Sequence, residues 1–225
     1  RRPMNFDFDY ALQILPTLLR ATVITFQATV GGMVLAMIVG LALELLRRSG
    51  VKPVVYATKG FVSFVRGTPL LIQLYFLYYV LPLYGLSLET METGILGLGL
   101  HYGAYLSEVY RAGIDGVPKG QWEAATALNA SRTHTWLRII LPQAVPPMLP
   151  VFGNYLIAMF KDTPLLATIT LLELLGTAQA EAAISYRYLE PYTLVGLIFL
   201  VLSWPSASLV RLIENRIRAE NRNGR

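Results

Sequence analysis

Four stretches of this sequence run for about 20 residues each without an Asp, Glu, Lys or Arg. They are Ala21–Leu43, Gly67–Leu88, Ile139–Phe160 and Pro191–Val210. A helix needs about 20 mostly apolar residues to cross the hydrocarbon core of a bilayer, where it satisfies all its own backbone groups. Buried helices of a soluble protein would rarely produce four such stretches in one chain. The stretches therefore predict an all-α integral membrane protein.

The composition agrees with this class. Only 15% of the residues are charged and 54% are hydrophobic, whereas a soluble domain carries about 25% charged residues. A fifth uncharged stretch, Thr93–Ser107, becomes long enough to span only when Glu108 and Arg111 lie near its end. We predict one transmembrane domain over residues 1–225 with about five helical spans. The spans are expected at approximately 18–46, 62–84, 93–112, 141–161 and 191–211.

Basic residues concentrate in alternate connections, and cytoplasmic loops carry the excess of Lys and Arg. The connection between the first two spans is basic, and the connection around Pro82–Glu92 holds no Lys or Arg. The basic residues of the first connection are Arg47, Arg48, Lys52, Lys59 and Arg66, and those of the tail are Arg211, Arg216, Arg218, Arg222 and Arg225. We predict an outside N-terminus and a cytoplasmic C-terminus. The net charge of +5 then reflects topology, and no nucleic-acid partner is expected.

Two segments depart from plain spans. The fourth span begins with Pro142, Pro146, Pro147 and Pro150, which predicts a distorted start, as at a hinge or a cavity wall. The apolar stretch Thr163–Leu175 is too short to cross a bilayer. It predicts a re-entrant or interfacial helix pair packed on the bundle.

A short cytoplasmic helix is predicted over residues 121–129, entered through Val117-Pro118. Its small residues allow close approach by another protein, and Glu123 is expected near the helix N-terminus, which favours negative charge. Trp122 and Trp136 flank it as candidate interfacial anchors. These features alone fit a docking helix and an amphipathic helix lying on lipid equally well.

Glu123-Ala124-Ala125, followed at this spacing by Ile139 and Leu141-Pro142, resembles the EAA loop of ABC importer permeases. The family has Gly where this chain has Asn129, and Asn is the non-Gly residue that best tolerates a left-handed backbone. The resemblance implies a coupling loop at approximately 113–140, whose helix docks into a groove on a cytoplasmic ATPase. It assigns the ATPase-coupling role to Glu123, Ala124, Ala125, Asn129, Ile139, Leu141 and Pro142.

Two further segments, Arg66–Gln73 and Lys161–Leu165, look like those of the polar amino acid uptake family of type I permeases, such as histidine, glutamine and arginine permeases. The resemblance covers nearly the whole chain. It implies a permease subunit in the bacterial inner membrane, importing a small polar zwitterion by alternating access. Implied partners are a cytoplasmic ABC ATPase dimer, a second permease (identical or paralogous), an extracytoplasmic substrate-binding protein and membrane lipid.

Polar side chains beside apolar spans commonly face a cavity. On this basis the substrate path is expected to include Arg66, Thr68, Gln73, Asn154, Lys161, Asp162 and Thr163. Plainer interpretations remain open: Arg66–Pro69 also fits a helix cap and turn, and Lys161-Asp162 also fits a paired, solvated helix end. Glu108 is expected to pair with Arg111, three residues on.

The chain contains no Gly-x-x-x-x-Gly-Lys-[Ser/Thr] phosphate loop. We therefore expect a transport subunit rather than an enzyme, without cofactor or metal, with ATP and Mg²⁺ bound by the partner ATPase. A self-sufficient channel or secondary transporter would call for carboxylates inside the spans, and the four uncharged stretches have none. A polar amino acid leads as substrate, and a compatible solute such as ectoine is the alternative.

Overall fold

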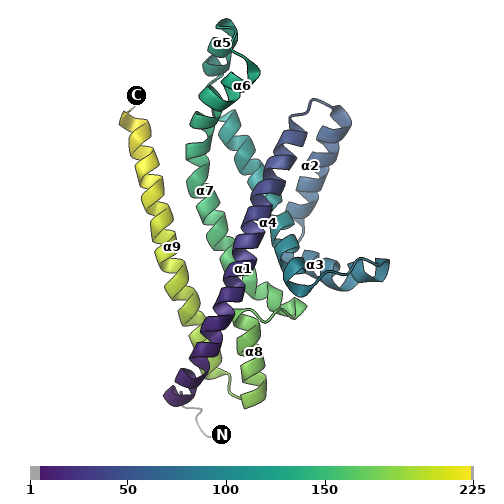
Figure 1. Cartoon of the computed structure of the whole chain (residues 1–225), viewed down its shortest axis with the longest axis vertical. Coiled ribbons are helices and arrows are strands. Elements are labelled where there is room, and N and C mark those ends of the chain that lie inside the picture. Colours follow the sequence, from purple (N-terminus) through teal and green to yellow (C-terminus); the bar gives the residue numbers. More distant parts are fainter. Residues whose placement is uncertain (1–5, 224–225) are drawn as a thin grey trace.

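The structure, a computed structural model, describes residues 6–223, and every regular element in that range is a helix. Figure 1 shows long helices gathered side by side, with short helices at both ends of the bundle. The first half comprises α1 (Phe8–Arg47), α2 (Lys52–Gly67), α3 (Leu70–Tyr75), a π-helix (Phe76–Val80), a 3₁₀ helix (Leu81–Tyr84) and α4 (Thr90–Asp115). The second half comprises α5 (Lys119–Ala127), α6 (Arg132–His134), a π-helix (Thr135–Ile140), α7 (Leu141–Asp162), a 3₁₀ helix (Thr163–Ile169), α8 (Leu174–Ser185) and α9 (Leu189–Asn223).

The two longest helices carry the first and last predicted spans. The Asp7 side chain caps α1 by accepting from the backbone N–H of Tyr10, so the helix begins ten residues before the predicted start at 18. By length and composition, α1 and residues Leu189–Ile217 of α9 can each cross a membrane alone. The start of α1 and the end of α9 lie at opposite ends of the molecule (Figure 1). Of the basic tail, Arg225 lies outside the described residues, and the side chains of Arg218 and Arg222 are not described.

The second predicted span is not one straight helix. Helix α2 ends at Gly67, and the segment Leu70–Tyr84 leaves it at 105°. The cause is local: Pro69 has no backbone N–H, and the residue before a proline is pushed towards extended backbone. Thr68 accordingly has φ −114° and ψ 142°. The range 62–84 is therefore corrected to a bent pair that is long enough for a broken span.

The fourth predicted span has the irregular start that its prolines predict. A π-helix precedes α7, and Pro146, Pro147 and Pro150 lie inside α7. After α7, the stretch Thr163–Leu175 forms a 3₁₀ helix and the start of α8, which both contact α1. This agrees with the packed helix pair that its short apolar run predicts. The helical run Arg132–Ile169 and α8 are bent by 45° at the break between them, and together they are long enough for a broken span.

Helix α4 contains the third predicted span and packs along α1 (Figure 1). The helices touch closely: a Cβ at Gly40 would lie 2.9 Å from the carbonyl oxygen of Gly103, and one at Gly103 would lie 2.8 Å from Val39. Small residues of this kind let membrane helices approach backbone to backbone. Among the described helices, α4 is not one of those that meet the length and composition of a span, and its crossing remains a prediction.

Candidate functional site

The predicted cytoplasmic helix is present as α5, which lies with α6 at one end of the molecule (Figure 1). It begins after Pro118, and its last turn closes with Leu128. Asn129 then takes a left-handed backbone, with φ 49°. Asn tolerates this conformation better than other residues with a side chain. Asn129 therefore adopts a backbone that glycine, the residue expected here from the EAA-loop resemblance, would also accept.

The exposed face of α5 differs from the predicted one. Glu123 and Ala124 are exposed, and the side chain of Leu128 at the end of the helix is 81% exposed. Ala125 is only 2% exposed, because it is on the side of α5 that faces the protein. Ala125 therefore does not line the exposed face of α5, and its coupling role stays a prediction. Glu123 is the fifth residue of α5, so it also lies beyond the first turn in which we expected it.

Helix α5 packs against a small hydrophobic cluster. The rings of Trp122 and Trp136 meet edge to face, with centroids 5.3 Å apart. They pack against a cluster that includes Ile140 and Ala144, with Ile139 at its edge. Trp122 and Trp136 therefore attach α5 to the start of α7, and their role as interfacial anchors stays a prediction. Leu141 is half-buried and Pro142 is exposed, and both belong to this first turn of α7.

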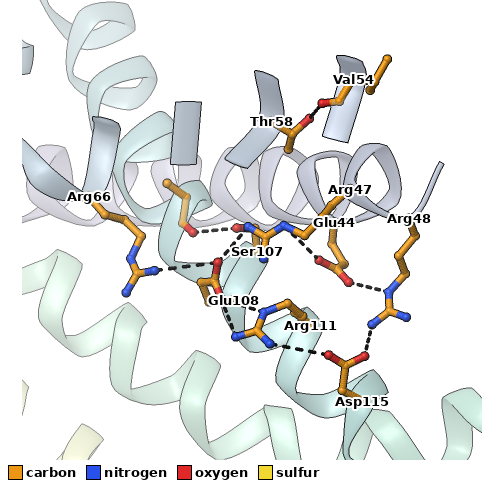
Figure 2. Close-up of polar contacts among 11 residues, drawn as sticks. Glu44, Arg47, Arg48, Val54, Thr58, Arg66, Ser107, Glu108, Arg111 and Asp115 are labelled. Atoms are coloured by element: carbon orange, nitrogen blue, oxygen red, sulfur yellow. Dashed lines mark hydrogen bonds and ion pairs between the residues drawn. The ribbon is translucent and has the colours of Figure 1, made fainter. Parts of the chain in front are cut away.

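Ionic side chains connect α1, α2 and α4 near the same end of the molecule. Figure 2 shows this charged cluster, defined as Glu44, Arg47, Arg48, Arg66, Glu108, Arg111 and Asp115. Glu108 is at its centre: one carboxylate oxygen accepts from Arg47 at 2.8 Å and the other from Arg111 at 2.8 Å. The predicted pairing of Glu108 with Arg111 is confirmed, and the contact with Arg47 joins α4 to α1.

The cluster extends to the end of α4, four residues before α5. Arg48, the C-cap of α1, donates to Glu44 and to Asp115. Burial disfavours the charge of Arg48, but these hydrogen bonds outweigh it and raise the pKa of the guanidinium above its usual value. Asp115 also pairs with Arg111 at 3.6 Å. The ion pairs of the charged cluster thus connect the end of α1 to the end of α4.

A second polar group lies deeper in the bundle and is formed by three helices. We define this polar–aromatic cluster as Gln73, His101, Tyr102, Tyr105, Tyr155 and Asp162. The Tyr102 hydroxyl donates to the Asp162 carboxylate at 2.6 Å, and a His101 ring nitrogen lies 3.2 Å from the Gln73 side-chain oxygen. The Tyr105 and Tyr155 rings have centroids 5.9 Å apart. Since Tyr102 lies near the middle of α4, these contacts place a carboxylate beside aromatic faces inside the bundle.

The predicted substrate-path residues are only partly brought together. Gln73 and Asp162 belong to the polar–aromatic cluster, and the Arg66 guanidinium lies 5.2 Å from the centroid of the Tyr105 ring. Thr68 caps the end of α2 through its hydroxyl, and the Gln73 amide donates to that hydroxyl at 2.7 Å. The proposed cap at Arg66–Pro69 is thus present, together with a contact to the cluster.

The other three predicted path residues are not members of the cluster, and among the described residues they form no hydrogen bond or ion pair with it. Thr163 is fully buried and donates to the Phe160 carbonyl at 2.7 Å, so its hydroxyl caps the end of α7, and its place in the path stays a prediction. Lys161 and Asn154 are exposed on α7. Asp162 bonds to Tyr102 rather than to Lys161, so the two neighbours do not form the locally paired helix end that was considered.

Sequence reasoning missed His101, Tyr102, Tyr105 and Tyr155 as site residues. One signal was available, because residues 101, 102 and 105 fall on one helical face by their i, i+3 and i, i+4 spacing. A cavity of about 330 Å³ adjoins the cluster and is lined by Arg66, Tyr105, Glu108 and Tyr155, among others. Among the described residues no group of three or more His, Cys, Asp or Glu is placed to hold a metal ion.

Residues 32–219 match the family described as "Binding-protein-dependent transport system inner membrane component". A probable amino-acid ABC transporter permease, y4tG of Sinorhizobium fredii, is 40% identical over 93% of this chain and 91% of its own length. The arginine transport system permease ArtQ of Bacillus subtilis is 32% identical over 97% of this chain and 100% of its own. A crystal structure of an amino acid ABC transporter with histidines superposes with a TM-score of 0.88 at 30% identity, covering 95% of this chain and 100% of the other.

Proposed function

The chain belongs to the family of binding-protein-dependent transport system inner membrane components, and on this premise we propose that it carries polar amino acids across the membrane. It is a permease subunit of an ABC importer, a multi-pass protein of the inner membrane, and it does not itself catalyse ATP hydrolysis. Such a subunit works with an ATPase and a substrate-binding protein. The resemblance to the polar amino acid uptake family is confirmed.

The observation that carries the amino acid proposal is the Asp162 carboxylate held by Tyr102 inside the bundle. An α-ammonium group pairs with a carboxylate and also favours aromatic faces, which Tyr105 and Tyr155 supply. Arg66 lies beside Tyr105, and its guanidinium can bind the α-carboxylate as the substrate moves along the path. The names of similar proteins point the same way, since ArtQ is an arginine permease and the superposed crystal structure is of an amino acid transporter with histidines.

We place the ATPase at the exposed face of α5. Glu123, Ala124 and Leu128 project there from a helix fixed to α7 by its tryptophan pair. In the proposed cycle, closure of an ATPase dimer pulls this helix and that of a second permease together. The ion pairs of the charged cluster transmit this movement to α1, α2 and α4. The substrate path then closes on one side of the membrane and opens on the other.

We infer an outside N-terminus and a cytoplasmic α5 from the distribution of Lys and Arg. The chain has no cysteine, so single cysteines report orientation without background. Ser87 and Thr133 are both exposed, and a cysteine at Ser87 should label in whole cells with an impermeant maleimide. A cysteine at Thr133 should label only after the membrane is opened. The opposite pattern would reverse the orientation and remove the coupling assignment.

The substrate proposal is tested with the complete transporter in proteoliposomes, with its binding protein present and ATP enclosed. Uptake of labelled arginine, histidine and glutamine is measured beside uptake of ectoine. We expect amino acid uptake that requires ATP. Import of ectoine alone would replace the amino acid assignment, and uptake without ATP would make the chain a secondary transporter.

The role of Asp162 is tested in the same vesicles. Asp162→Asn should raise the substrate concentration for half-maximal uptake about tenfold, because it removes a charge-assisted contact. Lys161→Gln changes the exposed neighbour and should have little effect. Equal uptake by both variants would remove Asp162 from the substrate path.

A further inference from the structure

A second, larger cavity of about 620 Å³ lies among the ends of α1, α2 and α4. It adjoins the charged cluster of Figure 2 but also includes residues of α2 that the transport mechanism does not use. Its basic lining residues are Arg47, Arg48, Lys59, Arg66 and Arg111, and its acidic ones are Glu44, Glu108 and Asp115. The lining thus holds five positive and three negative side chains, which leaves two positive charges uncompensated.

The uncompensated charge can be assigned to particular groups. Both oxygens of Glu108 are taken by Arg47 and Arg111, so Arg66 reaches that carboxylate only at 3.8 Å, beyond hydrogen-bonding distance. Lys59 forms no ion pair with the described residues. The Nε of Arg47 is buried and forms no hydrogen bond among them, but it lies 3.9 Å from Glu44 Oε2, which is likewise buried without a hydrogen-bond partner. The uncompensated positive charge of this cavity therefore belongs to Lys59 and Arg66.

The geometry favours an anion with several oxygens. Lys59 and Arg66 are seven residues apart, which is two turns, and therefore lie on one face of α2. A guanidinium binds two oxygens of a phosphate side by side, while an ammonium attracts the group as a point charge. Tyr56 and Phe64, on α2 near these cations, have side chains that are 70% and 67% exposed. These are suited to the acyl region beside a lipid headgroup.

We propose that this cavity binds a phosphate group at Lys59 and Arg66, presented by the headgroup of an anionic phospholipid or as inorganic phosphate. The bound group neutralises the two surplus charges and joins α2 to the ends of α1 and α4. The site shares Arg66 with the surroundings of the polar–aromatic cluster, where Arg66 lies beside Tyr105, whereas Lys59 lines this cavity and not the smaller one. The inference does not depend on which substrate the transporter carries.

The test uses the complete detergent-solubilised transporter and follows its thermal unfolding at constant ionic strength. One arm titrates short-chain phosphatidylglycerol, with phosphatidylcholine of the same chain length as the zwitterionic control. The other arm titrates inorganic phosphate against chloride. Saturable stabilisation by phosphatidylglycerol alone assigns the site to lipid, and stabilisation by phosphate assigns it to the free anion.

Variants connect the binding to the cavity. Lys59→Gln should weaken the binding about tenfold, since it removes one charge-assisted contact. Lys59→Arg, which keeps the charge, should bind as the unmodified protein does and shows that a loss is not a folding defect. Lys52→Gln removes an exposed lysine of the same helix that does not line the cavity and should change nothing. No stabilisation by either anion, or equal binding by Lys59→Gln and Lys52→Gln, would overturn the proposal.

Discussion

The coupling helix α5 and the polar–aromatic cluster are built in opposite ways. Helix α5 is nine consecutive residues, with an exposed face and one small hydrophobic cluster beneath it. The polar–aromatic cluster draws its side chains from α3, α4 and α7, up to 89 positions apart in the chain, as Gln73 and Asp162 are. The first surface depends on local sequence and the second on how three helices pack. Substitutions in the two regions should therefore fail in different, separable steps of transport.

The largest effect is expected for Glu123→Lys. The reversed charge costs little within α5, because Glu123 is exposed, but a like-charge contact at an interface costs several kcal/mol. Each 1.4 kcal/mol corresponds to about tenfold in binding, so we expect copurified ATPase and ATP-driven uptake to fall about a hundredfold. Both quantities are measured on the purified variant, after its unfolding temperature has been found equal to that of the unmodified protein.

The matched control is Asp9→Lys, which reverses an exposed charge at the opposite end of the molecule. It should retain the ATPase. If Glu123→Lys binds the ATPase as well as Asp9→Lys does, then the exposed face of α5 is not the coupling surface.

A smaller and different effect is expected for Tyr102→Phe in the polar–aromatic cluster. The variant removes the 2.6 Å hydrogen bond to Asp162, a contact to a charged group worth about 1.5–3 kcal/mol. Uptake should fall about tenfold while the ATPase stays attached. Tyr110→Phe, which removes a 3.3 Å hydrogen bond to a backbone carbonyl of α1, is the control and should transport normally. Loss of the ATPase in Tyr102→Phe would show that the two regions are not separable.

The smallest effects are expected at Asn129, which has φ 49°. Asn129→Gly should be nearly silent, because glycine adopts this backbone without strain. Asn129→Val should cost about 1–2 kcal/mol, because a β-branched side chain is poorly tolerated there. Hydrogen exchange in residues 119–127 should become roughly five to thirty times faster in the valine variant only. Equal exchange in both variants would mean that Asn129 does not determine the end of α5.

The same contrast explains what the sequence could predict. Helix α5 and its left-handed end at Asn129 were predictable because caps, helix formers and turn residues act over a few neighbours. The break after Gly67 also has a local cause, Thr68-Pro69. We predicted one continuous span there because the uncharged run continues across these two residues. The burial of Ala125 was not predictable, because the spacing of small residues does not say which side of a helix packs.

Contacts between side chains far apart in the sequence could be identified only from the packed structure. Nothing local places Asp162 against Tyr102, sixty residues away, or directs Arg47 rather than Lys59 to Glu108. The close packing of α1 on α4 through Gly40 and Gly103 brings these groups together. The sequence could thus locate the charged residues near the ends of the spans, but it could not show which of them form ion pairs with one another.

The central claim is that the ATPase docks on the exposed face of α5, and single-cysteine crosslinking tests it most directly. The unmodified chain has no cysteine, so a photoactivatable crosslinker can be attached at Ala124→Cys alone in the assembled transporter. The account predicts a crosslink from Ala124→Cys to the ATPase, and none from the buried neighbour Ala125→Cys or from Ala183→Cys on α8 at the other end of the molecule. A crosslink from Ala124→Cys to lipid or to the second permease, with none to the ATPase, would contradict it.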